Sequence, residues 1–378
     1  MVQFSPPQAT TALAARLAER IERDGPISLH DYMAACLYDP SWGYYRKRRP
    51  IGTAGDFVTA PEISQAFGEL IGLWCAEVWR LMGKPAEVRV VELGPGRGTL
   101  ISDALRALRA VPEFLARATV HLVEVSDSLR AEQALKIAGA PCPVIFHESL
   151  AEVPAGPSIV VANEYLDCLP IRQFVFDGVR RGWCERMVGF GGRGFSFVVG
   201  NAASDITHLP EAETCEEGDI FEVRPGADNF VDELAARAQQ APVSALLVDY
   251  GHTRPSLGDS LQAVRRHAFA GVFDAPGETD LTAHVDFHRL VERACETALR
   301  HSGPMPLGEW LLRLGIEVRA NQLLRAASPE DARQIVSGVR RLLDPAQMGV
   351  LFKTLVLWDG LAEPPPPFHV LSAKEARA

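Results

Sequence analysis

Four short apolar runs, separated by segments with helical periodicity, mark the first half of the chain. The runs are VRVVEL at 88–93, TVHLVEV at 119–125, PVIF at 143–146 and PSIVVANE at 157–164. Near-continuous apolar strands that alternate with helices are typical of a parallel sheet covered on both faces. The pattern therefore predicts an α/β fold. Two later runs extend the predicted sheet, SALLVDYGH at 244–252 and GVLFKTLVLW at 349–358.

Other patterns flank this predicted sheet. Apolar residues recur every four positions over 9–24 and predict an amphipathic packing helix, and a second helix is predicted over 63–82. The segment 38–62 is rich in Gly, Pro and aromatic residues and is long enough to be a functional loop. Alternating segments with Gly-rich turns predict antiparallel hairpins over 172–224. Residues 284–344 are predicted to be a long helical region.

Charge and cysteine usage narrow the class of protein. The chain of 378 residues has 48 acidic and 38 basic residues, a formal net charge of −10. This balance argues against nucleic-acid binding, which needs a basic surface. Seven scattered cysteines without a CxxC pair argue against disulfides and a Cys-based zinc site. No signal peptide and no apolar stretch of about 20 residues is present, so we expect an intracellular protein without membrane insertion.

The most informative motif is Glu92-Leu93-Gly94-Pro95-Gly96-Arg97-Gly98, at the end of the first predicted strand. A P-loop needs Lys-Ser or Lys-Thr, which is missing, and the dinucleotide fingerprint GxGxxG is one residue longer. The remaining pattern, E-x-G-x-G-x-G, is typical of Rossmann-like enzymes that bind S-adenosylmethionine (SAM). A carboxylate near the strand end suits a ligand with an amino group and a sulfonium. An ordinary Gly-rich turn is the alternative.

Polar residues also follow the next predicted strands. Glu124 lies 26 residues after Gly98, where an acidic side chain can accept both ribose hydroxyls of an adenosine. The third strand ends where an adenine pocket is expected, and the fourth ends at Asn163. Ligands bind at the carboxyl ends of strands in open α/β sheets. The predicted cofactor-binding residues are therefore Glu92, Gly94, Gly96, Gly98, Glu124, Glu148, Ser149, Leu150 and Asn163.

Eight motifs between about 25 and 358 together resemble the MidA family. They are YDPSWGYY, GTAGDFVTAPEISQAFGELI, VVELGPGRGTL, VANEYLDCLP, VDYGH, LTAHVDF, LLRLGIEVRA and GVLFKTLVLW. The family contains the mitochondrial complex I assembly methyltransferase and its bacterial homologues. The resemblance implies a SAM-dependent protein-arginine methyltransferase, and symmetric dimethylation of an arginine on a core subunit of NADH:quinone oxidoreductase. Because no transit peptide is visible, we expect a bacterial, cytoplasmic member.

Carboxylates are the expected catalytic groups, because they can orient a guanidinium and accept the proton released on methylation. Glu164 and Asp167 follow the fourth strand and are predicted to hold the target guanidinium. Asp56, in the 38–62 segment, is predicted to close the site as part of a lid. Helix capping is the alternative role for Glu164 and Asp167. Methyl transfer needs no metal, and the His residues near Asp249 and Asp286 match no zinc pattern.

The predicted fold is thus a Rossmann-like class I SAM-dependent methyltransferase sheet with an N-terminal helical and lid region, a β-hairpin insertion and a helical insertion. Five parts are expected along the chain. They are 1–85 with the N-terminal helices and lid loop, 86–171 with the SAM-binding core, 172–240 with the hairpins, 241–362 with the rest of the catalytic domain and a helical insertion, and an irregular tail at 363–378.

Other functions stay open at this point. The acceptor could be another protein or a small molecule, since specificity is expected to lie in 38–62 and 172–224. A non-catalytic assembly factor that keeps the SAM fold is a second class, although its cofactor motif would often have lost residues. An NAD-dependent enzyme conflicts with the glycine spacing. The sequence leaves the oligomeric state undecided, with a homodimer as one option.

Overall fold

The computed structural model of the protein describes residues 11–47, 59–204, 206 and 208–368. The chain divides into two compact units. Unit 1 comprises Met1–Phe57, Asp167–Asn229 and Arg254–His284, and unit 2 comprises Val58–Leu166, Phe230–Thr253 and Val285–Ala378. Asp56 lies outside the described residues, as do the other residues of 48–58 in the predicted lid segment. The finer division into five parts stays a prediction.

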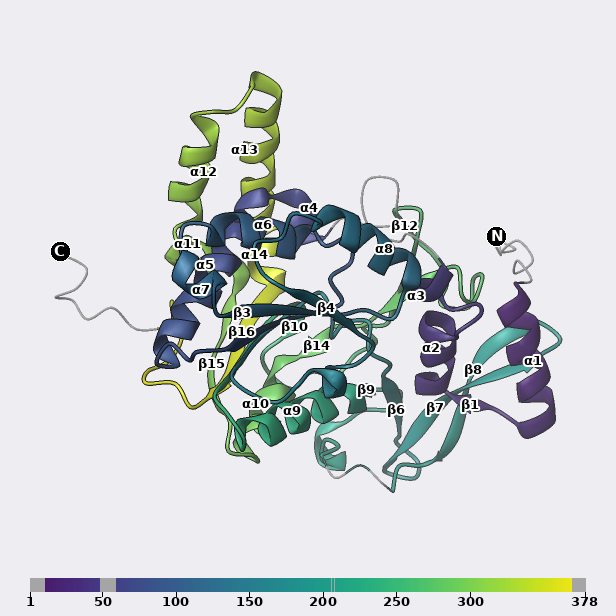
Figure 1. Ribbon diagram of the computed structural model, residues 1–378. Helices are drawn as coiled ribbons and strands as arrows, with labels where there is room; N and C mark the ends of the chain where they lie inside the picture. Colours follow the sequence, from purple (N-terminus) through teal and green to yellow (C-terminus); the bar gives the residue numbers. More distant parts are fainter. Residues whose placement is uncertain (1–10, 48–58, 205, 207, 369–378) are drawn as a thin grey trace. The chain divides into compact units, whose positions relative to one another are not determined.

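An eight-stranded sheet forms the centre of unit 2 (Figure 1). Its order is β15-β16-β10-β5-β2-β3-β4, and β14 pairs with β10. The strands β4, β3, β2, β5 and β10 run parallel, whereas β16 lies antiparallel between β10 and β15. The bounds are β2 (Val88–Leu93), β3 (Ala118–Val123), β4 (Val144–His147), β5 (Ser158–Asn163), β10 (Val243–His252), β14 (Val285–Asp286), β15 (Arg300–Pro306) and β16 (Phe352–Asp359). The predicted α/β fold with a largely parallel sheet is confirmed.

Helices surround this sheet. They are α4 (Ala60–Ile63), α5 (Gln65–Leu81), α6 (Thr99–Leu108), α7 (Pro112–Leu115), α8 (Asp127–Lys136), the 3₁₀ turn η1 (Leu150–Glu152), α10 (Phe287–Cys295), α11 (Leu307–Arg313), α12 (Ile316–Leu324), α13 (Pro329–Leu343) and α14 (Met348–Leu351). The helix α9 (Pro225–Ala238) begins in unit 1 and continues in unit 2. Figure 1 shows α12 and α13 side by side as a helical pair.

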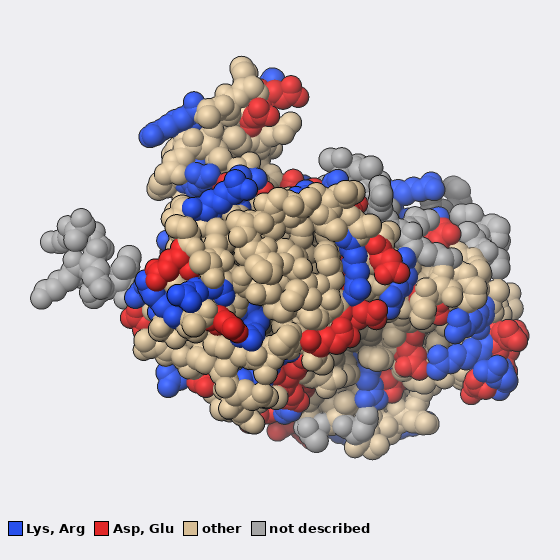
Figure 2. Space-filling view, in the orientation of Figure 1, with Lys and Arg blue, Asp and Glu red and all other residues tan. Residues whose placement is uncertain are grey.

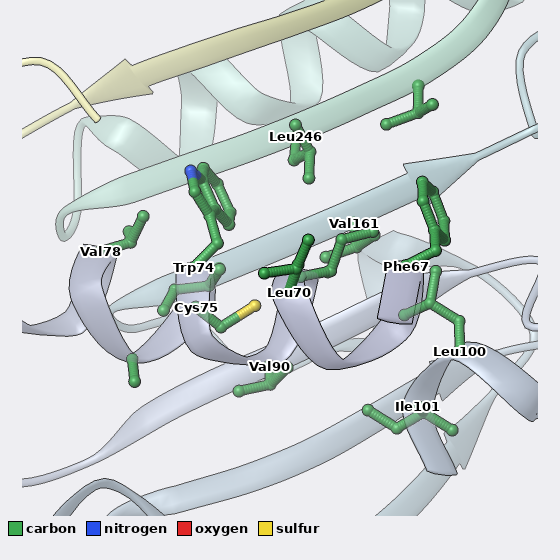
Figure 3. Packing of buried hydrophobic residues seen from close by; sticks show 14 of the residues in the cluster. Phe67, Leu70, Trp74, Cys75, Val78, Val90, Leu100, Ile101, Val161 and Leu246 are labelled. Carbon is green, nitrogen blue, oxygen red and sulfur yellow. The ribbon is translucent and has the colours of Figure 1, made fainter. Parts of the chain in front are cut away.

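The core of unit 2 lies between α5 and the sheet (Figure 3). Phe67, Leu70, Trp74 and Val78 follow helical spacing along α5, and all four are buried. They belong to one cluster with Val90, Leu100, Ile101, Val161 and Leu246 from the sheet and α6. A Cβ atom at Gly72 would lie 2.6 Å from the carbonyl oxygen of Ala104, so glycine lets α5 and α6 approach closely. This packing fixes the start of α6 beside the end of β2.

Two details of the predicted elements are wrong. The region 284–344, predicted to be a long helical region, contains the strand β15, whose sequence RHSGPMP carries no β-branched residue. The strand β15 stands at the sheet edge, where proline is tolerated because no neighbour needs its missing N–H. The last strand begins at Phe352 rather than at 349, because the short helix α14 precedes it.

Unit 1 is built around an antiparallel sheet, as the alternating segments predicted. The strand β7 pairs with β1, β6 and β8, and β6 also pairs with β9. A small second sheet has the order β12-β11-β13. The elements are α1 (Ala12–Asp24), β1 (Ile27–Ser28), α2 (Leu29–Tyr38), α3 (Tyr44–Lys47), β6 (Arg172–Asp177), β7 (Gly182–Gly191), β8 (Gly194–Ala202), the 3₁₀ turn η2 (Ala212–Thr214), β9 (Ile220–Val223), β11 (Gln262–Arg265), β12 (Ala268–Phe269) and β13 (Asp280–Thr282).

The first helix confirms the predicted packing face. Leu13, Leu17 and Ile21 of α1 are buried in a cluster of unit 1. Thr11 caps the helix by accepting the N–H of Ala14 at 3.0 Å. None of the helices in the described part of the chain is both long and apolar enough to span a bilayer. On the face drawn in Figure 2, Lys and Arg side chains lie interspersed with Asp and Glu.

Candidate functional site

The Gly-rich turn connects β2 to α6. Gly94, Gly96 and Gly98 have φ angles of 59°, 55° and 73°, a region that side chains with a Cβ atom rarely adopt. A Cβ atom at Gly94 would lie 3.1 Å from the ring of Tyr165. The glycines therefore make the tight turn possible and keep its backbone open to a ligand. The turn delivers the chain to the N-terminus of α6, whose first N–H groups have no partner within the helix.

This turn lies where the strand order of the sheet reverses. From β2 the chain continues to β3 on one side, and β5 lies on the other side. In open α/β sheets such a switch point is where ligands bind, outside the carboxyl ends of the strands. The register places Leu93 of β2 opposite Val123 of β3 and Ala162 of β5. Residues 92–94, 124 and 163–164 therefore share one edge of unit 2.

Glu92 is buried at the end of β2, with 4% of its surface exposed. Burial, with a smaller contribution from the nearby Glu124, raises the pKa of its carboxyl to about 8, and the backbone N–H of Ile101 in α6 opposes this shift. The Oε2 atom of Glu92 has no hydrogen-bond partner within the described part of the chain. One oxygen of Glu92 is thus an acceptor without a matching donor among the described residues.

Glu124, just after β3, is also buried. Its Oε1 accepts the N–H of Ser126 at 2.8 Å and its Oε2 accepts the Nε2 of Gln133 at 3.2 Å. Burial raises the pKa of Glu124, although these donors oppose the shift. Gln133 of α8 also donates to the carbonyl oxygen of Gly96 at 2.7 Å. Gln133 therefore joins the carboxylate to the Gly-rich turn, and its own Oε1 is buried without a partner among the described residues.

Asn163 and Glu164 end the fourth strand of the predicted series. Glu164 has a φ of 50°, which is uncommon for a residue with a side chain and is often found at functional sites. Its Oε1 accepts the backbone N–H of Ala60 at 2.8 Å and the Nδ2 of Asn163 at 3.2 Å. The Oδ1 of Asn163 accepts no hydrogen bond in the described structure. Asp249 of β10 fixes the next turn by accepting the N–H of Leu166 at 3.0 Å.

The other predicted site residues are placed differently. Glu148 and Ser149 are exposed after β4, and Leu150 is buried at the start of η1. Asp167 is buried but opens a segment of unit 1, where its carbonyl oxygen accepts the N–H of Ala283 at 3.0 Å. The remaining predicted residues, Glu92, Gly94, Gly96, Gly98, Glu124, Asn163 and Glu164, follow neighbouring strands of unit 2.

These residues fit SAM. Three buried acceptor oxygens, those of Glu92, Gln133 and Asn163, have no donor within the described residues. Buried polar atoms are nearly always paired in folded proteins, so three orphans near one turn indicate a ligand that donates hydrogen bonds. The amino group and ribose hydroxyls of SAM are such donors. Two carboxylates, Glu92 and Glu124, also suit its positive charge.

Two contributors were missing from the predicted site residues: Gln133 was not singled out, and Asp249 was considered only with the nearby His residues. Gln133 lies within an amphipathic helical segment and has no local signal. Asp249 lies in the VDYGH motif directly after an apolar run. This position near the end of a predicted strand could have identified it as a site residue. Among the described residues, no three His, Cys, Asp or Glu side chains lie together as ligands of a metal ion.

Comparisons with known proteins identify the family and its cofactor. A model of a SAM-dependent methyltransferase family matches residues 70–305. The chain is 36% identical to the mitochondrial protein arginine methyltransferase NDUFAF7 homolog of Drosophila melanogaster, over 93% of this chain and 85% of that protein. It is 34% identical to mitochondrial protein arginine methyltransferase NDUFAF7 of Homo sapiens, over 92% of this chain and 83% of that protein.

A solved structure shows the same similarity. The crystal structure of a Burkholderia thailandensis protein bound to S-adenosyl-homocysteine matches with a TM-score of 0.78 and 29% identity, covering 93% of each chain. The named relatives are mitochondrial proteins, so the predicted cytoplasmic location is contradicted. That prediction depended on the absence of a visible transit peptide, and where a sequence begins is not a guide to location.

Proposed function

Because the chain belongs to this family of SAM-dependent methyltransferases, we propose that it methylates an arginine side chain of a protein. The more specific proposal is symmetric dimethylation of an arginine on a core subunit of respiratory complex I, in support of its assembly. The names of the curated relatives support arginine as the acceptor. The complex I subunit and the symmetric product rest on the family resemblance alone.

Residues of unit 2 are proposed to hold the cofactor. The Gly94–Gly98 turn lets the backbone approach it closely. Glu92 and Asn163 offer free acceptor oxygens for the amino group, and Glu124 is proposed to accept the ribose hydroxyls. The exposed side chains of Glu148 and Ser149, with Leu150, are proposed to border the adenine. When bound, SAM supplies a methyl group already activated by a positive sulfur, so the protein mainly positions the acceptor.

Glu164 is proposed to hold the target guanidinium. Arginine is a poor nucleophile because its charge is delocalised, and a carboxylate can orient its N–H groups and localise the lone pair. As the nitrogen gains the methyl carbon it loses a proton, and the carboxylate of Glu164 accepts that proton. The C–S bond breaks with its electron pair staying on sulfur, which leaves the neutral thioether. The roles predicted from the sequence for Asp167, which lies in unit 1, and for Asp56, which lies outside the described residues, stay predictions.

One observation carries this assignment. Glu164 combines a left-handed backbone with a position directly after β5, at the switch point of the sheet. Strained backbone persists only where surrounding structure holds it, and here the N–H of Glu164 donates to the carbonyl oxygen of Val248 at 2.8 Å. The carboxylate of Glu164 accepts the N–H of Ala60, the first residue of α4, so it also satisfies the start of that helix.

Mass spectrometry of complex I tests the proposal. Complex I from cells with and without this protein is digested, and arginine methylation is mapped on its core subunits. We expect one symmetrically dimethylated arginine that is lost without the protein and restored by the wild-type chain. An unchanged pattern on complex I, with methylation lost from another protein or a small molecule, would identify a different acceptor. SAM binding without any methyl transfer would indicate a non-catalytic assembly factor.

A further inference from the structure

The short helix α4 touches both halves of the proposed reaction site within unit 2. At its start, the backbone N–H of Ala60 donates to Glu164 at 2.8 Å. Two residues later, the carboxylate of Glu62 accepts from the hydroxyl of Thr99, the first residue of α6 after the Gly-rich turn. Glu62 also pairs with Arg97 inside that turn, with 3.4 Å between Oε2 and Nη1. The single turn of α4 therefore contacts both Glu164, which is proposed to hold the guanidinium, and the Gly94–Gly98 turn, which is proposed to approach SAM.

Glu62 belongs to a set of charges around Thr99. Arg97 donates its Nε to Glu132 of α8 at 2.7 Å, and Lys136 of α8 donates to the Thr99 hydroxyl. The set thus contains two carboxylates and two cations, and Lys136 also interacts electrostatically with Asp103. The Glu62 side chain is 15% exposed and that of Glu132 is 21% exposed, so water screens the two carboxylates only in part, whereas Arg97 is 36% exposed and Lys136 is exposed.

The position of α4 is set by close packing. A Cβ atom at Gly338 of α13 would lie 2.3 Å from the carbonyl oxygen of Ile63, so only glycine lets α13 come this near. The helix also contacts α5 and α6. Because the backbone of α4 is held on these sides, Glu62 acts on the turn from a fixed point. The negative charge of Glu62 therefore affects the electrostatic potential in the Gly94–Gly98 turn as well as the shape of that turn.

We propose that Glu62 is a positioning residue that holds the Gly94–Gly98 turn against α4 and offsets the positive charge of Arg97 and Lys136. Without Glu62 the network loses a negative charge beside the site of a cationic cofactor. The loss of Glu62 therefore weakens the binding of SAM, which carries a sulfonium, more than the binding of S-adenosyl-homocysteine, which is a neutral thioether. The inference uses SAM binding alone, and it does not depend on arginine as the acceptor.

Isothermal titration calorimetry of the full chain with each ligand tests this role. For Glu62→Gln we expect SAM to bind about tenfold more weakly, the scale of one lost charge-assisted hydrogen bond. We expect S-adenosyl-homocysteine to bind only about threefold more weakly, and added salt to narrow the difference. A merely structural role would weaken both ligands equally and would therefore overturn the proposal. Unchanged SAM affinity in a folded variant would overturn it as well.

A matched control and a second variant keep the test decisive. Glu113→Gln removes a carboxylate of α7 that pairs with Lys84 at the surface, and it should leave both affinities within about twofold. If Glu62→Gln does not fold, Thr99→Val removes only the hydroxyl that joins Glu62 to Lys136. We then expect SAM binding about threefold weaker, and an unchanged affinity for SAM would contradict the proposal. Failure to methylate arginine would leave both results intact, so the two proposals fail separately.

Discussion

Two buried carboxylates of unit 2 have opposite surroundings. Glu69 of α5 has no exposed surface and accepts Arg319 at 2.6 and 3.0 Å, Arg106 at 3.1 Å and Gln65 at 2.9 Å. Burial raises the pKa of Glu69, but these donors outweigh it and the pKa is lowered overall. Glu92 is as deeply buried, yet one oxygen has no partner among the described residues and its pKa rises to about 8.

The difference separates a structural carboxylate from one prepared for a ligand. Glu69 ties α5 to α6 and α12, so its charge is neutralised by the protein itself. Glu92 is left without such a cation, at the point where the sheet order reverses. A buried carboxylate without its donor lowers stability, and such groups cluster at functional sites. The contrast predicts that changes near Glu92 affect binding and catalysis, whereas changes at Glu69 affect folding.

Glu164→Gln should give the largest effect. The amide keeps the shape of the side chain but cannot accept the released proton, so we expect kcat to fall by about 10²–10³-fold. The dissociation constant for SAM should stay within about twofold, since the cofactor contacts are proposed for other residues. Single-turnover methylation of the arginine substrate and calorimetry with SAM measure the two quantities.

Exposed Glu113 supplies the control for this change. Glu113→Gln should leave kcat and SAM affinity near those of the wild-type chain. Turnover by Glu164→Gln at the wild-type rate would remove Glu164 from the proposed mechanism. A loss of SAM binding instead of turnover would place Glu164 among the cofactor-binding residues and would contradict its proposed catalytic role.

Glu69→Gln should lower stability and spare binding. The change removes the carboxylate that Arg319 and Arg106 share, although Arg106 keeps its pair with Asp103 at 2.7 Å, and both guanidiniums are partly exposed. We therefore expect the free energy of unfolding to fall by about 2–3 kcal/mol, at the low end for a broken buried pair. Urea unfolding measures this loss, and SAM affinity of the folded variant should change by less than about twofold.

A control lies on the same helix. Glu77→Gln breaks a surface pair with Arg80, so we expect less than about 0.5 kcal/mol of lost stability. If Glu69→Gln abolished SAM binding in folded protein, the division between structural and ligand-directed carboxylates would fail.

Local signals predicted the parts of this site that lie on strands and in the Gly-rich turn. Apolar runs identify buried strands directly, and the three glycines at positive φ stand next to one of them. Partners that come from distant segments gave no such signal. Glu69 and Arg319 lie 250 residues apart in sequence, and Glu69 looks like an ordinary surface position of its helix. Its burial is a product of tertiary packing, which periodicity cannot reveal.

The conformation of Glu164 shows the same limit. Its place after the strand follows from the sequence, whereas its left-handed backbone depends on the hydrogen bond to Val248 of a neighbouring strand. Gln133 is similar, because a polar residue of an amphipathic helix gives no hint that it spans from Glu124 to Gly96. The strand β15 was missed because two prolines and no β-branched residue occur in it. These features arise when distant segments meet.

A pH dependence is also expected at Glu92. With a pKa near 8, this carboxyl is mostly protonated at pH 7, and a bound cation favours its charged form. SAM affinity of the wild-type chain should therefore rise with pH between 6 and 8, by up to about tenfold per unit. Glu92→Gln has no such titration. Its affinity should fall further behind that of the wild type as pH rises, and calorimetry at pH 6, 7 and 8 measures the ratio.

Stability of the ligand-free protein should show the opposite trend at Glu92. Its folded-state pKa is raised above the ordinary 4.5, so the folded state holds the proton more tightly than the unfolded state does. The stabilising contribution is present below pH 4.5 and is lost as pH rises towards 8, by up to about 1.4 kcal/mol per unit. Glu92→Gln should thus gain stability relative to wild type over this range, while Glu113→Gln should follow the wild type. Parallel curves for wild type and Glu92→Gln would show that Glu92 is ionised in both states, and the contrast with Glu69 would lose its electrostatic basis.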